Sequence, residues 1–127
     1  MLYALTGVDG VLVWTRGGYN ASRFFGYYPI HIKVFSADLP RWRRFLAKNG
    51  RKTFLAGRKP KETVFGVFYL LYPEKKIDAV AREGLMVEPL GETLRFCREN
   101  PYTFAPALEM LETRNHLDEK PTIQPTL

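Results

Sequence analysis

Residues 29–35, Pro-Ile-His-Ile-Lys-Val-Phe, alternate between two kinds of side chain. The side chains that an extended chain would place on one side are all aliphatic: Ile30, Ile32 and Val34. His31 and Lys33 would lie on the other side, because successive side chains of a strand point in opposite directions. The pattern predicts a β-strand with one buried face.

The residues after this strand predict an α-helix with one apolar and one basic side. Asp38 suits the N-cap, Pro40 suits the first turn, and Gly50 suits the position just past the end. The expected apolar stripe consists of Trp42, Phe45 and Leu46. Arginine and lysine cover most of the remaining helix surface, which predicts that this part faces solvent.

Three further segments predict strands. Residues 63–72 are rich in Val, Phe and Tyr and are apolar on both faces, so we expect a strand in the middle of the sheet that Pro73 ends. Residues 53–56 and 85–87 predict short strands.

Three segments in the second half of the chain predict helices. Residues 75–83 show the apolar spacing of a short helix that stops before Gly84. Residues 89–98 and 103–112 predict two longer helices, joined at the turn-forming pair of residues 100 and 101.

The N-terminal segment, residues 3–14, is apolar and contains two glycines spaced by three, Gly7 and Gly10. Leu5, Val8 and Leu12 share helical spacing, so we expect a helix whose glycines face a close neighbour. A shorter apolar run within it would also suit a strand. The glycine-rich residues 16–26 predict a loop.

These elements together predict an α+β fold. We expect a mixed β-sheet of about four or five strands, with helices mainly on one face and a C-terminal helical pair. A chain of 127 residues suits a single domain, which we place at residues 1–117. Residues 118–127 are polar, contain two prolines and predict a flexible C-terminal tail.

Charge is distributed unevenly along the chain. Residues 1–73 carry twelve bases and three acids, whereas residues 74–127 carry seven bases and ten acids. Nine of the 19 Lys and Arg residues fall in residues 41–61, in a stretch that contains no acid: Arg41, Arg43, Arg44, Lys48, Arg51, Lys52, Arg58, Lys59 and Lys61. This stretch predicts a nucleic-acid-binding surface, to which Trp42 and Phe54 would add stacking. A charged but merely solvated helix face is the alternative interpretation.

Other chemistry has little support in the sequence. Cys97 is the single cysteine and falls on an apolar helix face, so we expect a packed thiol rather than a nucleophile. His31 and His116 have no His or Cys at ligand spacing, and we therefore expect neither a metal site nor a cofactor. No G-x-S-x-G motif and no Walker-type phosphate loop is present. Four tyrosines near strand ends predict sheet packing: Tyr27, Tyr28, Tyr69 and Tyr72.

The composition predicts a cytoplasmic protein. The longest apolar run spans residues 64–72, far short of the roughly 20 residues that a membrane-spanning helix needs, and we find no signal peptide. Gln124 is the only glutamine, while Arg, Lys and Glu are plentiful, as is typical of proteins from thermophiles.

Two segments resemble known families. Leu-Thr-Gly-Val-Asp-Gly-Val-Leu-Val-Trp at 5–14, followed by a glycine-rich loop and Tyr-Pro-Ile-His-Ile-Lys-Val-Phe at 28–35, resembles the opening of small nucleotidyltransferase-like domains. Residues 85–94 together with residues 102–109 resemble the end of the AbiEi-type antitoxin-regulators of type IV toxin–antitoxin systems. There, a helix containing Glu-Thr and a helix with an Ala-Leu core follow a sheet.

The chain departs from both families in ways that affect function. AbiEi-type regulators usually carry an N-terminal DNA-binding winged helix, and we expect it here to be lost or to lie on a separate chain. His31 and Lys33 stand where the enzymes carry two metal-binding aspartates, and neither can replace a carboxylate on Mg²⁺. The resemblance therefore implies a binding or regulatory domain.

We expect a non-enzymatic regulatory domain of antitoxin-like type that contacts nucleic acid or an acidic protein partner, such as a cognate toxin. The alternative is a small enzyme acting on a nucleotide or phosphorylated substrate, with Asp9 or Glu62 as the reacting acid. A deep pocket with one of these acids beside several arginines would favour the enzyme, and a broad basic face would favour binding.

Overall fold

The computed structural model describes residues 1–58 and 64–123, with side chains as far as Arg114. Its elements, in chain order, are β1 (Tyr3–Leu5), α1 (Val8–Trp14), β2 (Tyr27–Phe35), the short 3₁₀ helix η1 (Ser36–Asp38), α2 (Leu39–Lys48), β3 (Lys52–Leu55), β4 (Gly66–Glu74), β5 (Val80–Arg82), β6 (Leu85–Val87), α3 (Leu90–Glu99) and α4 (Pro101–Ile123). The predicted α+β class is confirmed.

Six strands of the described chain form one mixed sheet in the order β3-β4-β2-β1-β6-β5. β2 pairs in parallel with β4, β4 with β3, and β1 with β6. The β1–β2 and β5–β6 pairs are antiparallel. The sheet is slightly larger than predicted, and β4 lies inside it as expected, although the strand passes through Pro73 instead of ending there.

The alternation in β2 has the predicted consequence. Ile32 and Val34 are buried and pack with Leu71 of β4 against Trp42 and Leu46 of α2. α2 thus covers this face of the sheet with its apolar stripe. The third stripe residue, Phe45, is 52% exposed and lies at the margin of the contact.

The helix expected over residues 3–14 is only half correct. Tyr3–Leu5 is strand β1, and the helix begins at Val8. Gly7 separates the two with φ of 56° and ψ of −128°, a conformation that costs glycine little and interrupts any regular helix. The expectation for Gly10 is confirmed, because a Cβ there would lie 2.8 Å from Glu88 Oε1.

The predicted helix at residues 75–83 is wrong. Its C-terminal part is strand β5, which pairs with β6 as a hairpin. The two connecting residues, Glu83 and Gly84, have φ of 51° and 80°. Positive φ at both turn positions matches the twist of a tight two-residue hairpin, so the turn outweighs the weak helical spacing.

The C-terminal helical pair is confirmed. α3 and α4 meet at Asn100 and build a second core, in which Val11 of α1 packs with Cys97, Phe104 and Leu111. α4 continues to Ile123, beyond the predicted helix end. The division into a domain and a flexible tail stays a prediction, and residues 124–127 lie outside the described residues.

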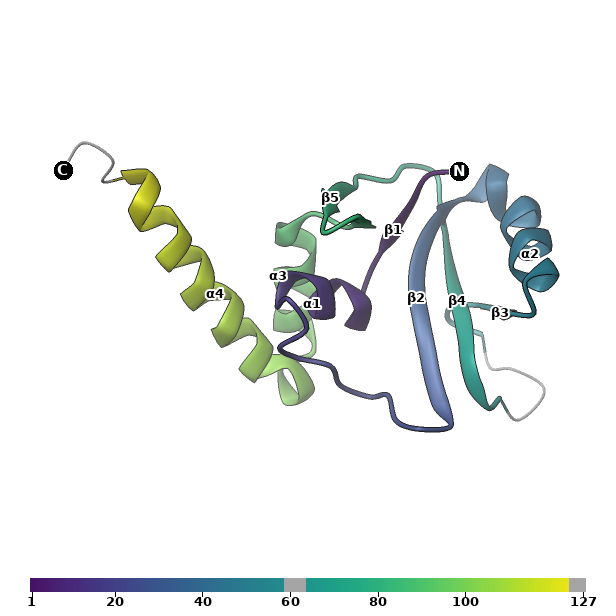
Figure 1. The fold of residues 1–127 in the computed structure, drawn as a ribbon, viewed down its shortest axis with the longest axis horizontal. Coiled ribbons are helices and arrows are strands. Elements are labelled where there is room, and N and C mark those ends of the chain that lie inside the picture. Colours follow the sequence, from purple (N-terminus) through teal and green to yellow (C-terminus); the bar gives the residue numbers. More distant parts are fainter. Residues whose placement is uncertain (59–63, 124–127) are drawn as a thin grey trace.

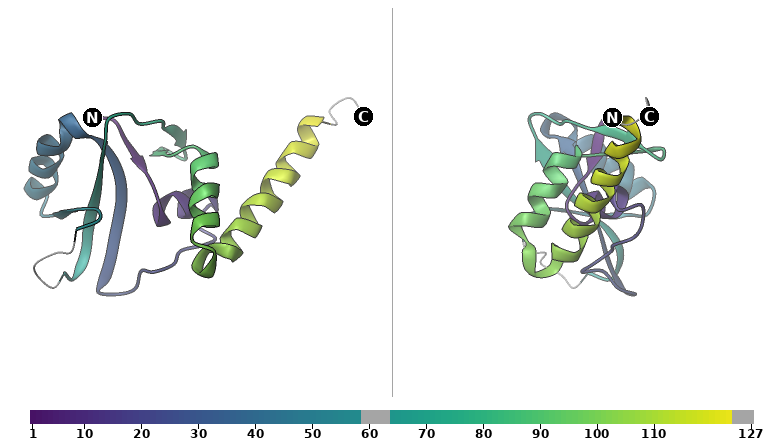
Figure 2. Two further views of the ribbon diagram at one scale, coloured as in Figure 1. Left: turned by 180° about the vertical axis from the view of Figure 1, so that it is seen from behind. Right: turned by 90° about the vertical axis from the view of Figure 1, so that its left-hand side faces the viewer.

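Figure 1 shows α2 on one side of β2 and β4, and α1, α3 and α4 together on the other side. In Figure 2 the same arrangement seen from behind places α2 and α4 at opposite ends of the molecule. Within residues 1–58 and 64–123, no helix combines the length and apolarity needed to cross a membrane.

Candidate functional site

The predicted basic stretch runs along α2, the turn after it and β3. Seven of its members are described, and all seven are exposed; we call them the basic surface: Arg41, Arg43, Arg44, Lys48, Arg51, Lys52 and Arg58. The other two predicted site residues, Lys59 and Lys61, lie outside the described residues.

Four of these cations lie on α2 and face solvent, because the opposite side of the helix packs against the sheet. Trp42 and Leu46 are 8% and 5% exposed, which fixes the rotation of the helix and turns the basic residues to solvent. Arg41 is paired with Asp38 at 3.6 Å. Among the described residues, no acidic side chain forms an ion pair with Arg43 or Arg44.

The predicted stacking role of Trp42 is contradicted by its burial, because a nearly inaccessible indole cannot receive a base. Phe54 is partly buried and makes an edge-on contact with Phe68, with ring centroids 5.7 Å apart. Trp42 is therefore closed to a base and Phe54 is partly covered, whereas Phe45 on α2 is 52% exposed.

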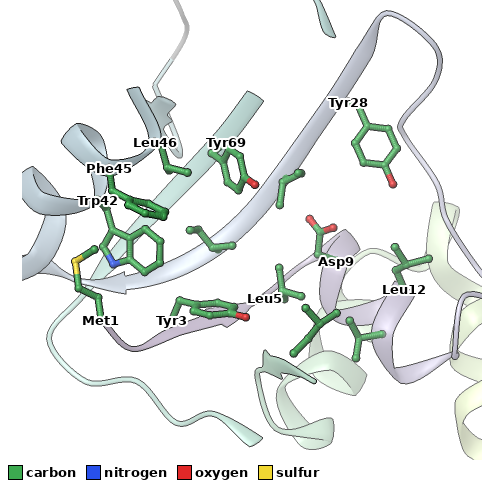
Figure 3. A pocket seen from close by; sticks show the side chains of 14 residues that line it. Met1, Tyr3, Leu5, Asp9, Leu12, Tyr28, Trp42, Phe45, Leu46 and Tyr69 are labelled. Carbon is green, nitrogen blue, oxygen red and sulfur yellow. The ribbon is translucent and has the colours of Figure 1, made fainter. Parts of the chain in front are cut away.

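A cavity of about 580 Å³ lies beneath α2, on the face of the sheet opposite His31 and Lys33. Its walls are mainly apolar and come from α1, α2 and the strands β1, β2, β4 and β6. Figure 3 shows Tyr3, Leu5 and Tyr69 among these walls, with Asp9 on the side away from Trp42. Several of these residues were expected on buried faces, among them Ile30, Ile32 and Trp42, and no pattern in the sequence predicts a cavity.

Asp9 is 5% exposed and is bonded through both of its oxygens. Arg23 Nη1 lies 2.5 Å from Oδ1, and the backbone N–H of His31 donates to Oδ2 at 2.6 Å. The Arg23 guanidinium also lies over the ring of Tyr28, 4.4 Å from its centroid. The carboxylate thus joins α1 to β2 and to the loop before it, and its charge is matched by an arginine whose side chain is fully buried.

His31 and Tyr72 form a polar pair on the opposite face of the sheet. His31 Nδ1 and Tyr72 Oη are 2.7 Å apart. Burial lowers the pKa of His31, an effect that Asp9 opposes and Arg23 reinforces. Burial also raises the pKa of Tyr72, and the negative charges of Asp9 and Glu88 add to the rise.

Lys33, next to this pair, is held by two carboxylates. Its Nζ lies 3.2 Å from Glu88 Oε2 and 3.2 Å from Glu92 Oε2. Burial alone would lower the pKa of Lys33, but the two glutamates outweigh it and the pKa is raised. Glu88 is 2% exposed and also accepts hydrogen bonds from Thr6 and Thr93 at 2.7 and 3.1 Å.

This network joins the turn after β1, strand β2, the segment after β6 and helix α3, and each charged member has a partner. Nothing in the sequence indicated the roles of Glu88 and Arg23, because their ion-pair partners, Lys33 and Asp9, are not their neighbours along the chain. Thr6 and Glu88, for example, are 82 positions apart. Within the described part of the chain, no three His, Cys, Asp or Glu side chains are grouped so that they could hold a metal ion.

The enzyme alternative required Asp9 or Glu62 in a deep pocket beside several arginines. Asp9 does line the cavity, yet the walls are mainly apolar and its one ion-pair partner among the described residues is Arg23. Glu62 lies outside the described residues. An apolar cavity is poorly suited to a phosphorylated substrate, since phosphate oxygens need several donors.

No protein-family model, no curated protein and no solved structure matches the chain. The resemblance to AbiEi-type regulators therefore stays a prediction. The case for a function rests on the basic surface, the cavity and the polar network of this chain.

Proposed function

We propose that the chain is a non-enzymatic binding domain that contacts nucleic acid through its basic surface. The observation that carries the proposal is the orientation of α2. Its apolar side is anchored on the sheet by Trp42 and Leu46, and its outer side presents exposed cations that continue into the edge strand β3.

The chemistry favours contacts to the phosphate backbone over base recognition. Arginine and lysine bind phosphate oxygens and release condensed counterions, a contribution that does not depend on sequence. Phe54 and Trp42 are both withdrawn from the outer surface. We therefore expect a duplex to bind with little sequence preference through these residues.

The regulatory character of the proposal comes from the resemblance to AbiEi-type antitoxins. A domain of that type would hold nucleic acid while another surface or chain responds to a signal. An acidic protein, such as a cognate toxin, is the competing partner for the same cations. It becomes the preferred interpretation if neither DNA nor RNA binds at low salt.

The test is a comparison of two charge reversals on opposite sides of the molecule. Binding of a short fluorescein-labelled DNA duplex is followed by fluorescence anisotropy at low salt. Arg43→Glu combined with Arg44→Glu should weaken binding about tenfold or more, because two phosphate contacts are replaced by repulsion.

Arg95→Glu combined with Arg98→Glu is the matched control. Both residues are exposed on a helix, α3, and the change in net charge is the same. The control should weaken binding by no more than about threefold, through the long-range field alone. Equal losses in the two variants would show that net charge, and not the basic surface, determines binding.

A further inference from the structure

The cavity beneath α2 has a polar group at each end, and the walls between them are mainly apolar but include the hydroxyls of Tyr3 and Tyr69. In Figure 3, Trp42 and Asp9 lie on opposite sides, with Tyr3, Leu5 and Tyr69 between them. A volume of about 580 Å³ falls within the range of pockets that hold small organic molecules, roughly 300–1,000 Å³. Such pockets combine apolar walls with a few polar groups that orient the ligand.

At one end, Trp42 offers a hydrogen-bond donor. Trp42 lines the cavity and is 8% exposed, and its Nε1–H is buried with no partner among the described residues. An indole N–H can only donate. The chain's other tryptophan, Trp14, donates to the backbone oxygen of Glu88 at 2.8 Å. In Figure 3 the Trp42 nitrogen lies on the edge of the ring beside Met1, another lining residue.

At the other end, Asp9 offers acceptor capacity. Among the described residues, its two oxygens accept one hydrogen bond each, from the guanidinium of Arg23 and from the backbone N–H of His31. A carboxylate oxygen has two lone pairs, so a further donor can be accommodated. Because Arg23 already balances the charge, a neutral N–H or O–H fits this end better than an ammonium group, which the guanidinium would repel.

We propose that this cavity binds a small, elongated and uncharged molecule with a flat apolar body. The ligand would carry a hydrogen-bond acceptor at one end for Trp42 and a neutral donor at the other end for Asp9. The proposal concerns the inner side of α2 and does not depend on whether nucleic acid binds the outer side.

A matched pair of fluorescent probes tests the Asp9 end without any mutation. The probe 2-acetyl-6-aminonaphthalene has a ketone acceptor at one end, an amine donor at the other and no charge. We expect saturable binding of one molecule per chain, with emission shifted to the blue in apolar surroundings. The dimethylamino analogue lacks the N–H and should bind more weakly by about tenfold or more, as for one lost hydrogen bond to a charged carboxylate.

Trp42→Phe tests the other end, because it keeps an aromatic ring in the core and removes the donor. This variant should weaken both probes by about threefold to tenfold. Arg43→Glu combined with Arg44→Glu is the control and should leave probe affinity unchanged. Thermal melting of each variant verifies that it is folded, and the wild-type comparison of the two probes stands if Trp42→Phe does not fold.

Three results would overturn the proposal. The first is the absence of saturable binding to the folded wild-type chain. The second is equal affinity for the two probes together with no effect of Trp42→Phe, which would place the probe elsewhere. The third is a dimer in sedimentation whose formation excludes the probe, which would show that a second copy of the chain covers the cavity.

Discussion

Gly10 lies where α1 makes its closest approach to the buried polar network. A Cβ at this position would lie 2.8 Å from Glu88 Oε1 and 2.9 Å from Thr93 Oγ1. Glu88 has little freedom to move, because it is bonded to Thr6 and paired with Lys33 as well. The glycine is therefore required by packing, although it lowers the intrinsic helix propensity of α1.

We predict that Gly10→Ala destabilises the fold by about 1–3 kcal/mol, because overpacking outweighs the gain in helix propensity. Chemical denaturation measures the change. Gly91→Ala is the control, since Gly91 lies in α3 with nothing within 4 Å of the added Cβ. A Gly10→Ala variant as stable as the Gly91→Ala variant would mean that Glu88 moves freely and that the network is not rigid.

His31 gives the fold a pH dependence. Its pKa in the folded chain is lowered, mainly by burial, from the ordinary value of 6.5. Between the folded pKa and 6.5, the His31 ring therefore binds more protons in the unfolded chain than in the folded chain. The free energy of unfolding consequently falls as the pH drops below 6.5 towards the folded pKa. Stability conferred by keeping this ring neutral is fully present above 6.5.

We predict that the free energy of unfolding of the wild type declines as the pH falls from about 6.5 to about 5.5, and that it declines less in His31→Gln. Urea denaturation at several pH values checks this. The slope with pH is compared, not the absolute stability, because His31→Gln also alters the hydrogen bond to Tyr72. Parallel slopes in the two proteins would show that His31 does not titrate with folding.

At the scale of elements, α4 is held to the body of the molecule by a short apolar stripe near its beginning. Phe104 is 4% exposed and packs edge-on against Phe96, with centroids 4.9 Å apart. Ala107 and Leu111 continue the stripe and are buried as well. The rest of the helix extends away from the sheet in Figures 1 and 2.

We predict that Phe104→Ala costs about 3–5 kcal/mol of stability, because it leaves a cavity between α3, α4 and the loop that carries Tyr19. Tyr102→Ala, two positions away in the same helix, is the control. Tyr102 is fully exposed, and its loss should change stability by no more than about 0.5 kcal/mol. Similar losses in the two variants would contradict the packing of α4 described above.

Elements with a strong local pattern were predictable from the sequence, and elements set by turns were not. The alternation in β2 and the amphipathic pattern of α2 each carry their own signal, and both were confirmed. Asp38 does occupy the N-cap of α2, but its side chain makes no capping hydrogen bond and pairs with Arg41 instead. The helix expected over residues 3–14 was wrong in its first half, because the backbone conformation of Gly7 separates β1 from α1 and apolar spacing does not reveal it. The β5–β6 hairpin was missed because its turn contains Glu83, a residue uncommon at positive φ.

The candidate sites differ in the same way. The basic surface was predictable because its residues lie within one short stretch of the chain. The cavity was not, because its lining residues come from α1, α2 and the sheet and are brought together only by the tertiary structure. The ion pairs of Glu88 and Arg23 likewise depend on tertiary structure.

At the scale of the whole molecule, the net charge of +6 is unevenly spread. The basic surface lies on α2 and β3, at the end of the molecule opposite α4 (Figure 2). The long-range field should therefore orient an approaching polyanion towards α2. The central claim is that this orientation ends in direct contacts between phosphates and the arginines of α2.

The salt dependence of binding tests that claim most directly. The logarithm of the affinity for a DNA duplex is measured against the logarithm of the salt concentration for the wild type, for Arg43→Glu with Arg44→Glu, and for Arg95→Glu with Arg98→Glu. Each phosphate contact contributes about 0.9 to the slope, so the α2 variant should have a slope shallower by about 2, and the α3 variant should keep the wild-type slope. The same slope in all three proteins would contradict the claim, because it would mean that Arg43 and Arg44 contact no phosphate.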